Sequence, residues 1–286
     1  MNADDFGLTR GVNRAVMELH EIGVLTSATL MARATASEEA ITMATNCTSL
    51  GVGCHVVLVD GEPVLPLREI PTLADGGTGR FHSSLGAFLG KLLLGHIRSS
   101  EIEAEAAAQI TLLRERGLSL AHIDSHKHTQ MFPAVLRPLL RAARSAGVGA
   151  VRNPFEPAWS RRVTPAAFSL RRMEVSLLSQ LEPAFRRIVA EEGITTTDGS
   201  LGVLATGTLD ARTVNSLLKS IPPGTWELVT HPGYNDADLA RTKTRLKQSR
   251  ETERQALLAV GNFAGLDLIN FAKLAADTLK LPQTQR

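Results

Sequence analysis

Residues 119–128 read SLAHIDSHKH, a β-prone run that passes directly into a cluster of ionisable side chains. His122, Asp124, His126 and His128 occupy every second position. Because alternate side chains of an extended backbone share one face, this spacing predicts that all four point to the same side. An apolar interior does not accept four such groups unless something binds them. The stretch therefore predicts a strand that leads into a metal site, against the alternative of a surface strand or a structural histidine.

Two further β-prone runs end in the same way. GCHVVL (residues 53–58) contains His55, and LVTHPGY (residues 228–234) places His231 directly after an apolar run. Along the chain such runs alternate with amphipathic helices, which predicts mainly parallel strands joined by crossover helices. Polar groups in these folds gather at the carboxyl ends of the strands, so we expect the clusters to meet.

This alternation predicts six or seven β/α units, in an open doubly wound sheet or a closed barrel. Strands are expected within residues 23–32, 50–59, 119–124, 148–152 and 226–230, and helices within 11–22, 37–46, 101–116, 133–146 and 244–260. The chain reads as one domain, residues 1–286, with elaborations around residues 60–100 and 154–192.

The overall composition excludes several classes of protein. With 43% hydrophobic and 21% charged residues, the 286-residue chain is globular and not disordered. A net charge of +2 gives no indication of nucleic-acid binding. The acidic start lacks the basic and apolar regions of a signal peptide, and the two cysteines form no CxxC pair. We therefore expect a reduced, cytoplasmic protein.

The first residues, MNADDFG, place two carboxylates side by side at positions 4 and 5. Neighbouring side chains of a strand diverge, so Asp4 and Asp5 are not expected to share one ion in an extended backbone. Where a strand passes into a loop, one of them can bind the metal while the other acts as a general base. His231 suits a general acid because the ordinary pKa of imidazole lies near 6.5; the alternative is a turn residue before Pro232.

Four of these stretches, in order, resemble the motifs of YdjC-like carbohydrate deacetylases. They are NADDFG, GCHVVL, HIDSHKH and HPGY, and RETERQAL (residues 250–257) is similar to the late Arg-Glu helix of that family. The resemblance covers nearly the whole chain. GCHVVLVDGEPVLP and SHKHTQMFP look closest to the branch associated with hopanoid biosynthesis, the HpnK-like proteins.

The resemblance implies an incomplete or distorted (β/α) TIM-like barrel that removes an N-linked acetyl group from an amino sugar. By similarity, Asp5, His55 and His126 correspond to the metal ligands, Asp4 to the catalytic base and His231 to the acid that protonates the leaving amine. The family's usual metals are magnesium and zinc.

The remaining polar residues of these motifs are expected to contact the substrate or to support the ligands: His122, Asp124, His128 and Arg152. Gln130 departs from the family pattern, which often has a histidine there. The hopanoid branch implies an N-acetylglucosaminyl glycolipid as substrate and a location peripheral to the inner membrane. A homodimer is the candidate assembly. The arginines between residues 154 and 192 form either a solvated helix face or a surface for such a glycolipid.

The start of the chain carries an expectation of its own. In the resembling family an apolar strand leads into the aspartate pair, whereas this sequence begins almost at the pair. We therefore expect the first strand to be missing or truncated, with its two neighbours unpaired, and the natural protein to start upstream.

Two alternatives to a deacetylase stay open. A metal phosphoesterase would use similar Asp and His ligands, although the sequence offers no second carboxylate-rich cluster for a two-metal site. An inactive, truncated family member that binds carbohydrate is the other.

Overall fold

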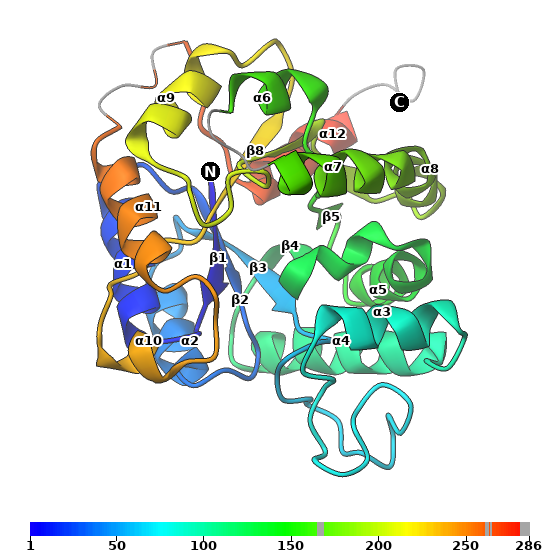
Figure 1. Ribbon diagram of the computed structural model, residues 1–286. Helices are drawn as coiled ribbons and strands as arrows, with labels where there is room; N and C mark the ends of the chain where they lie inside the picture. The colour runs from blue at the N-terminus through cyan, green and yellow to red at the C-terminus, as the bar shows by residue number, and fades with distance from the viewer. Residues whose placement is uncertain (165–168, 261–262, 264, 281–286) are drawn as a thin grey trace.

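One all-parallel sheet organises the molecule. The computed structural model describes residues 1–164, 169–260, 263 and 265–280 (Figure 1). Within these residues eight strands follow the order β6-β5-β4-β3-β2-β1-β8-β7. The strands are β1 (Asn2–Phe6), β2 (Ser27–Leu30), β3 (Gly51–Val56), β4 (Leu120–Ser125), β5 (Ala150–Val151), β6 (Thr195–Thr196), β7 (Gly199–Leu201) and β8 (Trp226–Thr230).

The sheet curls into an incomplete barrel. Its edge strands, β6 and β7, are close neighbours in sequence but lie at opposite ends of the strand order, and no ladder joins them among the described residues. The α/β, TIM-like but incomplete barrel expected from the sequence is therefore confirmed. All the neighbouring strands are parallel, so their carboxyl ends open on one face.

Helices surround the sheet, as Figure 1 shows. The α-helices are α1 (Arg10–Glu21), α2 (Ser37–Thr45), α3 (Leu85–Leu93), α4 (Ser99–Glu115), α5 (Pro133–Ser145), α6 (Ala158–Val163), α7 (Ser169–Leu178), α8 (Glu182–Glu191), α9 (Ala211–Lys219), α10 (Ala237–Arg241), α11 (Gln248–Leu258) and α12 (Phe271–Lys280). Two 3-10 helices are η1 (His126–Met131) and η2 (Ser179–Leu181). Neighbouring crossover helices pack together, for example α1 on α2 and α4 on α5. None of the described helices combines the length and apolar character needed to cross a bilayer.

The position of the first strand is filled. β1 pairs with β2 through Asn2 and Ala3, and the same two residues pair with β8 on the other side. The expectation that β2 and β8 lack a partner is therefore wrong. Backbone pairing on both sides holds this short polar strand, and the Asn2 amide nitrogen donates to Asp4 Oδ1 at 3.0 Å inside the barrel.

The expected geometry of HIDSHKH is also only partly correct. β4 ends at Ser125, and Lys127 and His128 take left-handed backbone conformations with φ of 58° and 53°. Only His122 and Asp124 therefore share a strand face. The turn redirects His126 and His128, and it places His126 at the carboxyl end of the barrel.

Candidate metal centre

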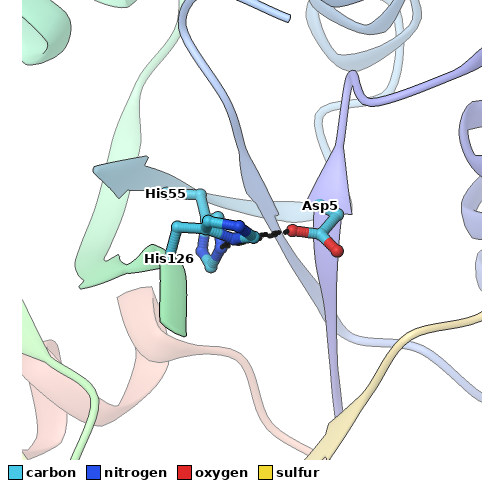
Figure 2. A group of neighbouring side chains, drawn as sticks. All are labelled: Asp5, His55 and His126. Atoms are coloured by element: carbon cyan, nitrogen blue, oxygen red, sulfur yellow. Dashed lines mark hydrogen bonds and ion pairs between the residues drawn. The ribbon is translucent and has the colours of Figure 1, made fainter. Parts of the chain in front are cut away.

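Three side chains from separate strand ends converge on one point. Asp5 lies on β1, His55 on β3 and His126 directly after β4. Asp5 Oδ1 is 3.4 Å from His55 Nε2 and 3.3 Å from His126 Nδ1, and the two ring nitrogens are 3.3 Å apart (Figure 2). The structure thus brings together the three residues that the sequence predicts as metal ligands.

The backbone of β1 explains how adjacent aspartates reach one site. Asp5 has a φ of 63°, and the pairing of β1 with β2 shifts register between Ala3 and Phe6. A left-handed non-glycine residue is strained by about 1–3 kcal/mol and persists only where its surroundings hold it. Here the irregularity directs both Asp4 and Asp5 into the barrel, although a regular strand would separate them.

The three donor atoms fit a divalent cation. Donors placed tetrahedrally at about 2.0–2.1 Å from an ion are about 3.3–3.4 Å apart, which matches the observed separations. Asp5 Oδ1 is buried and accepts no hydrogen bond from the described residues. Two imidazoles and a carboxylate are ordinary ligands of zinc and of several other divalent metals. His126 is the most accessible of the three, with a side chain 21% exposed, so the site opens to solvent on its side.

A second group of possible metal ligands, Asp4, His55 and Asp124, already surrounds a positively charged side chain of the protein. Asp4 and Asp124 lie near His55, but the buried Arg152 guanidinium occupies the space between them. Arg152 Nη1 and Nη2 donate to the two oxygens of Asp4 at 2.8 and 2.6 Å, and Nη1 also contacts Asp124 Oδ2. The described residues therefore offer one metal position and not a two-metal site.

Two neighbours orient the triad. His55 Nδ1–H donates to Asp124 Oδ1 at 2.8 Å, which turns Nε2 toward the centre. Arg250 pairs with Asp5 Oδ2 and leaves Oδ1 for an ion. Burial lowers the pKa of His55, but the charge and hydrogen bond of Asp124 outweigh it and raise that pKa to about 10. The pocket thus favours a positive charge beside these carboxylates.

Asp4 and His231 adjoin the triad. His231 Nε2 lies 3.7 Å from Asp4 Oδ2, while its Nδ1 is 3.8 Å from Glu253 Oε2. Burial opposes the charged form of both groups. Arg152 nevertheless holds the pKa of Asp4 below its ordinary value, and Glu253 raises the pKa of His231. The arrangement keeps a carboxylate and a protonatable imidazole side by side.

The other predicted histidines lie differently. His128 faces the same interior, and burial together with nearby Arg152 lowers its pKa to about 3. His122 has Gly53 as its register partner, and its ring stacks on Phe271 of α12 with centroids 3.8 Å apart. Burial lowers the pKa of His122 to about 3, so it is a neutral packing group.

Sequence reasoning did not assign roles to three charged residues that hold the site. Arg250 and Glu253 lie on α11, within the RETERQAL stretch, where an Arg and a Glu three positions apart gave a usable indication. Glu227, on β8, contacts Arg152 and had no such indication beyond being a charged residue in an apolar run.

A cleft of about 950 Å³ lies near the carboxyl ends of β1, β2 and β3. Its lining includes Leu8, Met31, Val57 and Asp60. Asp60 accepts a hydrogen bond from Lys127, the residue after His126, at 2.9 Å. This pair links the cleft to the segment that carries His126.

The buried Arg152 should also matter for folding. Replacing Arg152 by methionine leaves Asp4, Asp124 and Glu227 buried without their cation, and we expect a loss of about 3–5 kcal/mol in the free energy of unfolding. Urea denaturation measures this loss. The control is Arg137→Met, which breaks an exposed pair with Glu191 and should cost less than about 1 kcal/mol. Equal losses in the two variants would contradict the expectation.

Comparison with known proteins places the chain among the YdjC-like proteins, whose family pattern matches residues 1–261. A carbohydrate deacetylase of Thermoanaerobacter pseudethanolicus is 26% identical, over 90% of this chain and 89% of that protein. A carbohydrate deacetylase of Mus musculus is 31% identical, over 82% of this chain and 77% of that protein. A third, from Brevibacillus brevis, is 41% identical over 54% of this chain, and the match spans only 58% of that protein.

A solved structure from Enterococcus faecalis V583, of a protein assigned to cellobiose-phosphate cleavage, has the same fold. It superposes with a TM-score of 0.73 at 24% identity and covers 96% of this chain and 97% of its own. This likeness supports the architecture of the incomplete barrel.

Proposed function

The chain belongs to the YdjC-like protein family, and on that basis we propose that it is a metal-dependent carbohydrate deacetylase. The observation that carries the proposal is the convergence of Asp5, His55 and His126, with Asp4 and His231 beside them. Its substrate would be the N-acetyl group of an amino sugar. We place the catalytic unit in one domain, residues 1–286.

Asp5, His55 and His126 would hold the metal, and Asp124 would keep the His55 ring in the ligand orientation. A divalent cation held there would polarise the acetamide carbonyl and lower the pKa of a water molecule. The ligand set does not choose between magnesium and zinc.

Asp4 and His231 would divide the proton transfers. Asp4, held ionised by Arg152, would take a proton from the attacking water. His231, whose pKa Glu253 raises against the effect of burial, would be protonated and would donate to the leaving amine. The half-buried His128 would contact the substrate in its neutral form.

The cleft near the carboxyl ends of β1, β2 and β3 suits the rest of the sugar. Its lining carries both acids and bases, such as Asp60, Glu62, Arg33 and Lys243, which can bind hydroxyl groups. The finer proposal is a hopanoid-linked N-acetylglucosamine as substrate. The apolar part of such a glycolipid would lie outside this polar cleft. Exposed Leu170, Met173 and Leu177 on α7 would offer an apolar surface for it at the membrane.

Acetate release tests the proposal directly. We expect the protein, supplied with Mg²⁺ or Zn²⁺, to release acetate from N-acetylglucosamine oligosaccharides or glycolipids. A chelator should abolish the release and added metal should restore it, because the metal supplies carbonyl polarisation. Release of phosphate from model phosphoesters with no release of acetate would contradict the proposal and favour the phosphoesterase.

His231→Ala should keep the metal and lower turnover, because His231 contacts Asp4 and Glu253 but none of the ligands. The loss should be about 10²–10⁴-fold for poor leaving amines and smaller for good ones, which need no protonation. Steady-state rates on a series of N-acetyl substrates measure this trend. An unchanged rate with a poor leaving group would remove His231 from the acid role.

A further inference from the structure

Glu227 is a buried carboxylate that the proposed chemistry does not use. It lies on β8 with 3% of its surface exposed, and Arg152 is its one hydrogen-bonding partner within the described residues. Glutamate is rarely buried to this extent without a specific pairing. Its place in the barrel interior therefore calls for an explanation.

Glu227 holds one edge of the Arg152 guanidinium. A single oxygen, Glu227 Oε1, accepts hydrogen bonds from Arg152 Nε at 2.9 Å and from Nη2 at 2.7 Å. Two hydrogen bonds to one edge fix both the plane and the rotation of the planar group. The opposite side of the guanidinium then faces Asp4 and Asp124.

Neutralising Arg152 does not by itself explain Glu227, whose charge also acts on the Met1 ammonium. Asp4 already binds Arg152 through both of its oxygens, and one carboxylate neutralises one guanidinium. A further buried anion costs desolvation free energy. In addition, Glu227 Oε2 has no hydrogen-bond partner among the described residues, which is unfavourable for a group kept only for stability.

We propose that Glu227 is a positioning residue that orients Arg152, and through it both the Asp4 base and the Asp124 carboxylate that holds His55. Asp4 contacts Nη1 and Nη2, and Asp124 contacts Nη1, so a rotation of the guanidinium displaces both. Glu227, on β8 next to β1, thus couples the proton acceptor to a metal ligand through Arg152. The inference rests on the proposed deacetylase function for its effect on rate.

Two substitutions at Glu227 separate orientation from charge. Glu227→Gln keeps an acceptor oxygen at the same reach but removes the charge, whereas Glu227→Asp keeps the charge and withdraws the acceptor by one methylene. If Glu227 acts by orienting Arg152, the kcat of the Glu227→Asp variant should fall by about 10–10²-fold. The Gln variant should lose no more than about threefold, because its amide oxygen still accepts both bonds. KM should stay nearly constant in both, since Glu227 lies beneath the substrate side of the site.

Glu101 provides the matched control. It is 4% exposed, and its carboxylate accepts hydrogen bonds from the backbone of Thr72 and Leu73 and from Arg98, away from the triad. Glu101→Asp and Glu101→Gln should change stability and leave kcat at the wild-type value. A kcat order of Asp above Gln at position 227 would overturn the inference, as would wild-type kcat in the Asp variant.

Hydrogen exchange gives a readout that does not depend on activity. The Nε–H of Arg152 is buried and donates to Glu227, so its hydrogen should exchange slowly with solvent in the wild type and in Glu227→Gln. The nitrogen-15 NMR signal of this group measures the exchange. The hydrogen should exchange at least about tenfold faster in Glu227→Asp. Arg152→Lys, which lacks the group, identifies the signal. Wild-type protein that releases no acetate would defeat the proposed function, whereas equal exchange in all three proteins would defeat the orienting role.

Discussion

His126→Ala and His55→Ala should each remove both the bound metal and the deacetylase activity. Each substitution takes one nitrogen from the set of three donors found among the described residues, which lie 3.3–3.4 Å apart. The two remaining donors hold an ion far more weakly, so we expect less than about a tenth of the wild-type metal content after dialysis. Elemental analysis measures the metal, and acetate release measures the activity.

His96→Ala is the matched control because His96 is exposed and lies outside the site. It should keep both metal and activity. Full metal content in either His55→Ala or His126→Ala would show that the ligand assignment is wrong. Loss of activity with retained metal would instead place that histidine in the proton transfers.

Loss of folding is not expected to account for the loss of metal and activity in these two variants. His126 lies at the solvent-facing side of the centre, so its truncation leaves little buried space. His55 is buried and bonded to Asp124, and its truncation leaves that carboxylate with Arg152 as a partner. Circular dichroism and thermal unfolding of both variants should therefore show a folded barrel.

The strands could be predicted where their composition is distinctive. The runs that became β3 (Gly51–Val56) and β8 (Trp226–Thr230) are rich in β-prone residues and were placed correctly. β6 and β7 were not predicted, because strands of two and three residues carry too little pattern. β1 escapes prediction for another reason: Asn2, Asp4 and Asp5 are polar although they are buried, so the strand has no apolar pattern to read.

The candidate ligands could be predicted because histidines and paired aspartates at strand ends are uncommon. The backbone conformation that orients their side chains could not be predicted. Left-handed conformations at Asp5, Lys127 and His128 are imposed by tertiary contacts, and no glycine or asparagine marks these positions. The period-two interpretation of HIDSHKH is therefore wrong about the geometry of His126 and His128, while the roles of these residues stay a prediction.

The supporting charges follow from contacts that a single sequence does not contain. Arg250 and Asp5 form a pair although they are 245 positions apart. Arg152 joins carboxylates from β1 and β8, which are adjacent strands, to one from β4, which lies three places from β1 in the strand order. A barrel interior collects such distant residues, so their partners become visible only in three dimensions.

Asp4→Asn should distinguish most clearly the role of general base from the role of metal ligand. Asparagine keeps the size of Asp4 but cannot take up a proton at neutral pH, so turnover should fall by about 10²–10⁴-fold. Metal content should remain, because Asp5, His55 and His126 supply the ligands and Asp4 binds Arg152 instead. Arg152 keeps Asp124 and Glu227 as anionic partners in this variant, so the fold should survive. Asp5→Asn is the paired measurement and should lose metal as well as activity. Equal metal loss in the two variants would contradict the division of roles between these adjacent aspartates, and full activity of Asp4→Asn would remove Asp4 as the base.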